Sequence, residues 1–289
     1  MKKILVSIVL IIFISLLGGC LKRDSLEGID IYTTIYPIEY ITNRLYGTHS
    51  NIKSIYPSGI NVDEYTLTDK QIKDYSKASM YIFNGLDKDK DYVIPMFNYN
   101  KNIKIIDTTL SMEYINSKEE LWLDPSNFLM LAQNIRNGFK EYINNFYLKE
   151  EIDENYEALK LEVSNLDAKI KLMVESADTK TIVVADDLFK YLEKYNINVI
   201  SLEENDNLTE KVINNVRNLI TSGEITYIFT KQNSIANNTV KSLLDTTSVE
   251  LITFNSISNL STEEIKNKKD YLTIMNDNIE LLKNELYAD

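Results

Sequence analysis

The stretch IDIYTTIYPIEYITNRLYG, residues 29–47, opens as a β-rich run and continues with helical composition. Isoleucine, tyrosine and threonine dominate its first part up to Pro37, as expected of a strand that ends at a turn residue. Similar β-rich runs, separated by helical stretches, lie at 52–57, 80–85 and 103–107. Strands that alternate with helices predict a mostly parallel sheet that is covered on both faces.

The same pattern returns in the second half of the chain. β-rich runs lie at 180–186, 196–202, 224–230 and 249–255, again with amphipathic segments between them. We therefore predict an α/β fold of two lobes, each with a mostly parallel sheet flanked by helices. The expected organisation is a signal segment at 1–19, an N-terminal lobe at 20–148, a linking helix at 149–177 and a C-terminal lobe at 178–289.

The segment between the two halves predicts one long helix. Its apolar residues follow alternating spacings of four and three, which place them on one side of a helix. They are Ile152, Tyr156, Leu159, Val163, Leu166, Ile170 and Met173. A stripe of this kind is more typical of core packing than of a coiled-coil partner face. We expect the helix to join the lobes stiffly and to limit how far the cleft opens.

The N-terminus has the pattern of a bacterial lipoprotein signal. Lys2 and Lys3 precede an apolar run at 4–17, and LGGC ends at Cys20. A basic start, a short apolar run and small residues are typical of a secretory signal, and the run is shorter than the ~20 residues that span a bilayer. LGGC resembles a lipobox, and Cys20 is the only cysteine of the chain. We expect a lipid on Cys20 to anchor the exported protein to the outer face of the cell membrane; the alternative is a plain signal peptide with an unmodified thiol.

Composition and charge exclude several classes of function. The chain has 289 residues, 44% of them hydrophobic, and a net charge of −12, which is unfavourable for a nucleic-acid groove or an anionic membrane surface. The sequence has no P-loop, no Rossmann glycine fingerprint, no CxxC pair and no nucleophile elbow. The single histidine, His49, lies in a polar turn sequence. No catalytic arrangement can be assembled from the spacing of these residues, so we do not expect an enzyme.

Eight stretches of the chain, in order, resemble the motifs of one family. They are TTIYPIEYITNRLYG (33–47), YPSGINVDEYTLTDKQI (56–72), ASMYIFNGLDKD (78–89), ELWLDPSNFLMLAQNI (120–135), VVADDLFKYLEKYNI (183–197), YIFTKQNS (227–234), ITFNSIS (252–258) and YLTIMNDNIELLKNEL (271–286). On these motifs the chain resembles the zinc- and manganese-type substrate-binding lipoproteins of bacterial ABC importers, several of which are also described as adhesins. The resemblance implies two α/β lobes, a long linking helix and a ligand cleft between the lobes in which a metal ion is buried.

The resemblance also implies where a metal ion would bind, although the residue types differ from those of the family. The positions of the three histidine ligands and of the acidic ligand are, in chain order, Asp63, Glu120, Asp186 and Asn255. A shift of one residue in two motifs would select Glu119 or Asp187 instead. Oxygen donors alone suit manganese, calcium or magnesium better than zinc, which favours nitrogen and sulfur. Two alternatives stay open: a site that has lost its metal, and a site for another small ligand.

The expected function is therefore that of an extracytoplasmic, lipid-anchored protein that delivers a divalent cation to the permease of a metal-type ABC importer. We expect a monomer that contacts the membrane through Cys20 and binds no nucleic acid. The alternative is a degenerate family member that acts as a surface adhesin or accessory lipoprotein, or that binds another small ligand.

Overall fold

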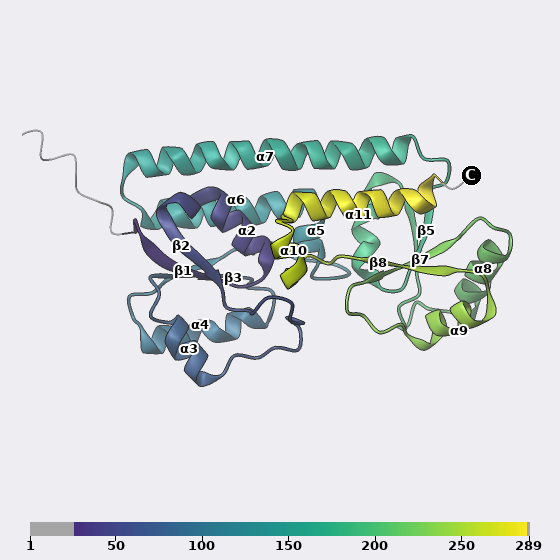
Figure 1. Ribbon diagram of the computed structural model, residues 1–289, viewed down its shortest axis with the longest axis horizontal. Coiled ribbons are helices and arrows are strands. Elements are labelled where there is room, and N and C mark those ends of the chain that lie inside the picture. The colour runs from purple at the N-terminus through teal and green to yellow at the C-terminus, as the bar shows by residue number, and fades with distance from the viewer. Residues whose placement is uncertain (1–25, 288–289) are drawn as a thin grey trace, which may run out of the picture.

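Two parallel sheets, one in each half of the chain, form the framework of the protein (Figure 1). The computed structural model describes residues 26–287, so the predicted signal segment and Cys20 lie outside the described residues. The strands are β1 (Ile29–Thr33), β2 (Ser50–Ser54), β3 (Met80–Phe83), β4 (Lys104–Asp107), β5 (Thr181–Val184), β6 (Asn198–Ser201), β7 (Tyr227–Lys231) and β8 (Glu250–Phe254). They form two four-stranded sheets with the orders β2-β1-β3-β4 and β6-β5-β7-β8.

The helices follow the strands as the alternating pattern predicts. They are α2 (Tyr36–Tyr46), α3 (Asp69–Tyr75), α4 (Val93–Tyr99), α5 (Glu120–Leu123), α6 (Pro125–Tyr142), α7 (Phe146–Glu175), α8 (Glu210–Thr221), α9 (Asn238–Thr246), α10 (Thr262–Lys266) and α11 (Tyr271–Leu286), with the 3-10 helices η2 (Gly47–His49), η3 (Lys88–Tyr92) and η4 (Asp187–Tyr195). No helix within residues 26–287 is long and apolar enough to cross a membrane.

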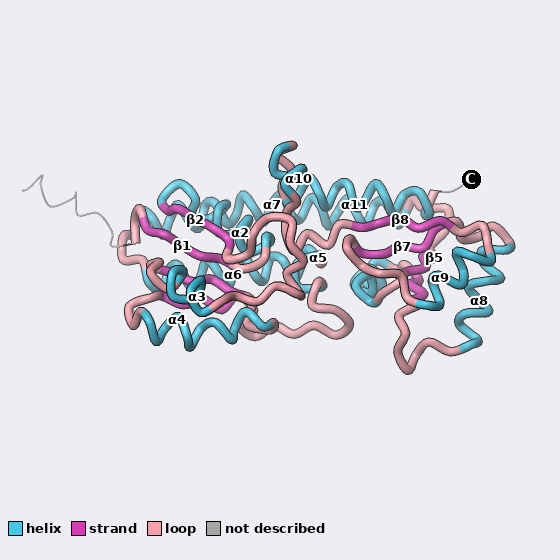
Figure 2. Tube along the Cα trace, turned by 60° about the horizontal axis from the view of Figure 1, so that its bottom comes forward, coloured by secondary structure: helices cyan, strands magenta, loops and turns pink. Residues whose placement is uncertain are grey.

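Both sheets have the same topology. Every strand pair is parallel, and the first strand of each lobe lies between the second and the third. In the N-terminal sheet Ile31 is level with Ile52 on one side and with Met80 on the other. Helices cover both faces of this sheet, with α2 and α6 on one side and α3 and α4 on the other (Figures 1 and 2). The predicted two-lobe α/β fold is confirmed.

The long helix α7 runs along both lobes (Figure 1). Asn145 caps its start, because the side-chain oxygen accepts hydrogen bonds from the backbone N–H groups of Tyr147 and Leu148. All seven residues of the predicted apolar stripe are buried, where they pack α7 against α2 and α6 of the first lobe and against α11 and η4 of the second. Arg44 of α2 adds a two-point ion pair to Glu162, at 2.7 and 2.9 Å. The predicted linking helix is therefore present, and its stripe is part of the core.

The last helix, α11, also joins the two lobes. At its start the Tyr271 ring stacks on Phe128 of the first lobe, with ring centroids 4.0 Å apart. Near its end the buried carboxylate of Glu285 accepts hydrogen bonds from the backbone N–H groups of Thr226 and Tyr227 in the second lobe. Two helices thus tie the lobes together, and one continuous apolar core extends from Ile31 into the C-terminal lobe. This arrangement restrains opening of the space between the sheets.

Candidate functional site

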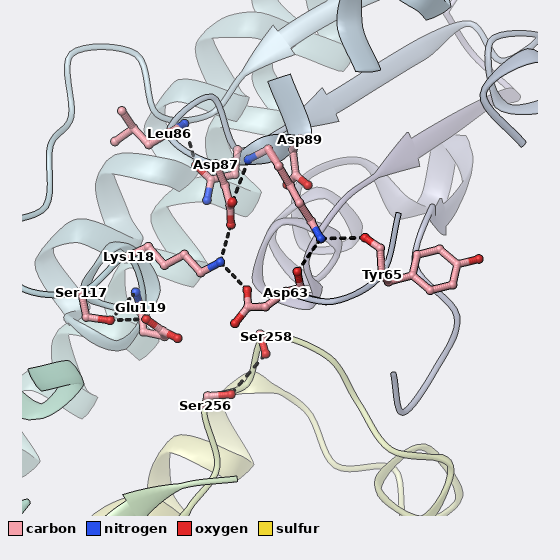
Figure 3. A network of polar contacts seen from close by, with 12 residues as sticks. Asp63, Tyr65, Leu86, Asp87, Asp89, Ser117, Lys118, Glu119, Ser256 and Ser258 are labelled. Carbon is pink, nitrogen blue, oxygen red and sulfur yellow. Dashed lines mark hydrogen bonds and ion pairs between the residues drawn. The ribbon is translucent and has the colours of Figure 1, made fainter. Parts of the chain in front are cut away.

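Loops that follow the carboxyl ends of the strands in both lobes enclose a polar cavity of about 260 Å³. This is the edge of a parallel α/β sheet at which ligands usually bind. The cavity is lined by Gly59, Ile60, Asn61, Asp63, Glu119, Lys231, Gln232, Asn233, Ser256, Ser258, Asn259 and Ser261. Asp63 and Glu119 come from the first lobe and lie near Ser256 and Ser258 of the second (Figure 3).

Asp63 lies in the loop after β2, and its carboxylate is already paired inside the first lobe. The Lys118 ammonium donates to Asp63 Oδ1 and, at 2.7 Å, to Asp87 Oδ2 (Figure 3). Lys88 fixes the loop by donating to the backbone oxygens of Asp63 and Tyr65, at 3.0 and 2.6 Å. Burial alone would lower the pKa of Lys118, but the carboxylates of Asp63 and Asp87 raise it by a larger amount. The pKa of Lys118 therefore lies above its ordinary value. Lys118 therefore stays charged beside Asp63.

Glu119 and Glu120 are neighbours in sequence, but their side chains line different cavities. Glu119 lines the cavity, is 5% exposed, and accepts from Ser117 Oγ and from Lys231 Nζ, the latter at 3.3 Å. Glu120 is equally buried but accepts from the backbone N–H of Ile115 at 3.2 Å and from Asn116 Nδ2 at 2.8 Å. It lines a second cavity, which first-lobe residues form together with η4 of the second lobe. The expectation that Glu120 shares one cavity with Asp63 is thus corrected to Glu119, the one-residue shift that the sequence left open.

Asp186 lies two residues after the end of β5, where the charges of Lys231 and Glu119 act on it. One carboxylate oxygen caps η4 by accepting from the backbone N–H of Leu188 at 3.4 Å. The other, Oδ2, is buried and has no hydrogen-bond partner among the described residues. Burial raises the pKa of Asp186 to about 6, the Lys231 charge opposes this, and the Glu119 charge adds to it. Asp186 therefore does not line the cavity, but its carboxyl group has a free acceptor and lies close enough to Lys231 and Glu119 for their charges to act on it.

Asn255, the fourth predicted ligand, is engaged in holding its own loop. Its Oδ1 accepts from the backbone N–H of Ile257 at 2.8 Å, and its amide nitrogen donates to Glu264. It does not belong to the cavity lining. The expectation that all four predicted ligands face one cleft therefore fails for Asn255 because its side chain stabilises the turn before α10.

The site as a whole pairs acids with lysines. Among residues 26–287 no three histidine, cysteine or acidic side chains lie close enough together to hold a metal ion. Sequence reasoning missed Lys118 and Lys231, the two ammonium groups beside Asp63 and Glu119. A signal was available, because Lys118 directly precedes Glu119 and Lys231 directly follows a β-rich run. The metal-binding role of Asp63 and Asp186 stays a prediction.

Comparisons with known proteins give one consistent result. The family model described as "ZnuA: Zinc-uptake complex component A periplasmic" matches residues 31–285. A metal ABC transporter substrate-binding lipoprotein of Lactococcus lactis is 26% identical over 243 residues, covering 76% of each chain. The substrate-binding lipoprotein SloC of Streptococcus mutans is 28% identical over 220 residues, covering 67% of this chain and 69% of SloC.

Solved structures with the same fold include two from related proteins. The Zn(II)-bound ZnuA-like domain of Streptococcus pneumoniae AdcA superposes with a TM-score of 0.71 at 20% identity, covering 90% of this chain and 99% of that domain. The metal-dependent lipoprotein YcdH of Bacillus subtilis gives a TM-score of 0.73 at 17% identity, covering 89% and 99%. At these identities the likeness concerns the fold, whereas the family model matches nearly the whole described chain. The protein belongs to the ZnuA family of metal ABC transporter substrate-binding lipoproteins.

Proposed function

We propose that this protein is the extracytoplasmic substrate-binding component of an ABC importer and acts by binding rather than by catalysis. The observation that carries the proposal is the polar cavity between the lobes, enclosed by loops from the carboxyl ends of both sheets. Such a cavity can hold a small ligand between two rigid bodies and present it to a permease. Membership in the ZnuA family supports this role, and the cavity offers no separate support for an adhesin.

The ligand that we propose is a divalent cation held by oxygen donors. Asp63 and Glu119 face the cavity, and Asp186 adds a buried oxygen without a partner beside it. The cavity lining contains no histidine or cysteine, so the donor chemistry favours manganese, calcium or magnesium over zinc. Glu119 replaces Glu120 in the ligand set that the sequence suggested. The proposed set is thus Asp63, Glu119 and Asp186. These side chains must move closer together to hold the ion, because no three acidic side chains of residues 26–287 are spaced for a metal ion in the structure.

Deleting the gene should lower the cellular content of the transported cation when the medium is depleted of it, as measured by inductively coupled plasma mass spectrometry. The wild-type gene should restore the content. A double variant, Asp63→Ala with Glu119→Ala, should restore almost none of it, because it removes two of the three proposed ligands. Glu120→Gln is the matched control and should restore it fully. Unchanged manganese, calcium, magnesium and zinc contents after deletion would contradict cation import.

We also propose that a lipid on Cys20 anchors the protein, as the lipobox-like LGGC suggests. Cells grown with a radiolabelled fatty acid should incorporate label into the wild-type protein. The Cys20→Ala variant should lose all of it, because no other cysteine is available. Label that survives the substitution would refute the anchor.

A further inference from the structure

The ammonium group of Lys231 lies among the acidic side chains that the proposed function assigns to a cation. Lys231 is the last residue of β7 and belongs to the C-terminal lobe. Its Nζ is 3.3 Å from Oε1 of Glu119, which belongs to the N-terminal lobe. The negative charges of Asp186 and Asp63 also interact electrostatically with this ammonium group. Burial alone would lower the pKa of Lys231, but the three acidic side chains raise it above its ordinary value. One positive charge therefore interacts with all three proposed ligands.

The Lys231–Glu119 contact differs from the ion pair of Asp63. Lys118 binds Asp63 and Asp87 within one lobe, whereas Lys231 joins the two lobes across the cavity. The Glu119 carboxylate is almost completely buried, so its charge requires a partner inside the protein. Lys231 provides that partner and remains partly accessible, with 31% of its side chain exposed. A flexible stem that reaches solvent allows the ammonium to leave the cavity.

We propose that Lys231 is a built-in cation that occupies the position of the divalent ion between the lobes, so that a metal ion binds only by displacing it. The inference rests on the proposed cation site and assigns to Lys231 the control of its affinity. An ammonium and a divalent ion cannot share the same carboxylates, because each repels the other at these distances. Lys231 thus weakens metal binding and keeps the lobes linked when the cavity holds no ion.

The test is calorimetric titration of the full-length chain in detergent with manganese chloride and with calcium chloride. Lys231→Met keeps the length of the side chain but removes its charge. We expect this variant to bind manganese at least about tenfold more tightly than the wild type, since a repelling charge next to the ion is gone. Lys231→Arg retains the charge and should bind as weakly as the wild type. Adding Glu119→Gln to Lys231→Met should abolish the gain.

Lys194→Met is the matched control. Lys194 also forms an ion pair between the lobes, to Asp124 at 2.5 Å, but it lies outside the cavity. This variant should leave the manganese affinity unchanged, which separates a local effect from a loss of charge or a loosening of the lobes. Equal affinities of wild type and Lys231→Met, no binding by either, or an equal gain in Lys194→Met would each overturn the inference.

The outcomes also separate this inference from the proposed function. If deletion leaves cellular cation contents unchanged while Lys231→Met binds manganese more tightly than the wild type, Lys231 is confirmed as the occupant and cation import is refuted. If deletion lowers the cation content but Lys231→Met has no effect on affinity, the import function stands and the role of Lys231 is refuted. Thermal unfolding of each variant shows whether it is folded during the titration.

Discussion

Replacing Trp122 with alanine should lower the free energy of unfolding by about 3–5 kcal/mol, the usual cost of removing a fully buried tryptophan side chain. The Trp122 side chain is 1% exposed, on the short helix α5 that packs against η4 of the other lobe. Its indole N–H donates to the backbone oxygen of Ser256 at 2.7 Å, and its own backbone oxygen accepts from Tyr271 Oη at 2.5 Å. The substitution therefore leaves a cavity where the two lobes meet.

Far-UV circular dichroism in a denaturant series is the appropriate measurement, because Trp122 is the only tryptophan and its fluorescence disappears with it. Trp122→Phe is the matched control: it keeps an aromatic ring but loses the hydrogen bond to Ser256 and part of the indole volume, so it should cost less than the alanine substitution. A loss below about 1 kcal/mol for alanine would show that the indole does not support the junction between the lobes.

Raising the pH from about 4 to about 6 should reduce the stability of the protein through the buried carboxyl group of Asp89. This residue is 1% exposed and accepts from Tyr56 Oη. Burial raises the pKa of Asp89 from 3.8 to about 6, despite the opposing hydrogen bond from Tyr56. The folded chain then binds more protons than the unfolded chain in this window, so the free energy of unfolding falls as pH rises, by up to ~3 kcal/mol.

Asp89→Asn isolates this contribution, because the amide accepts from Tyr56 but does not titrate. Asp186, whose pKa is also raised to about 6, contributes with the same sign in both proteins and cancels in the comparison. The stability of the variant relative to the wild type should therefore increase as the pH rises from about 4 to about 6 and stay constant above that window. Denaturant unfolding at a series of pH values measures it. A difference that does not change with pH would exclude ionisation of Asp89 as the cause.

The fold was accessible from the sequence because its signals are local. Each strand is a short β-rich run, and each run in the first lobe precedes a helix within a few tens of residues. The apolar stripe from Ile152 to Met173 predicted one helix face, and that face is buried in α7. Patterns of this kind depend only on the repeat of a helix or a strand. They determine the two lobes and their link without reference to long-range contacts.

The choice between Glu119 and Glu120 needed the tertiary structure. Successive residues of a helical turn point about 100° apart, so a register shift of one residue moves a carboxylate from one cavity to another. Both side chains are acidic and buried, and both precede Trp122 in the same motif. Nothing local distinguishes them. Only the packing of α5 against the two lobes places Glu119, and not Glu120, in the cavity that Asp63 lines.

The sequence by itself determined the lipoprotein-type signal, the two α/β lobes, the long helix and the oxygen-rich character of the candidate site. The tertiary structure alone decided that lysines neutralise the acids of that site. Lys231 and Glu119 are 112 positions apart and belong to different lobes. Their contact depends on how two separately folded sheets are placed relative to each other, and that placement is fixed by α7, α11 and the shared core rather than by any pattern near either residue.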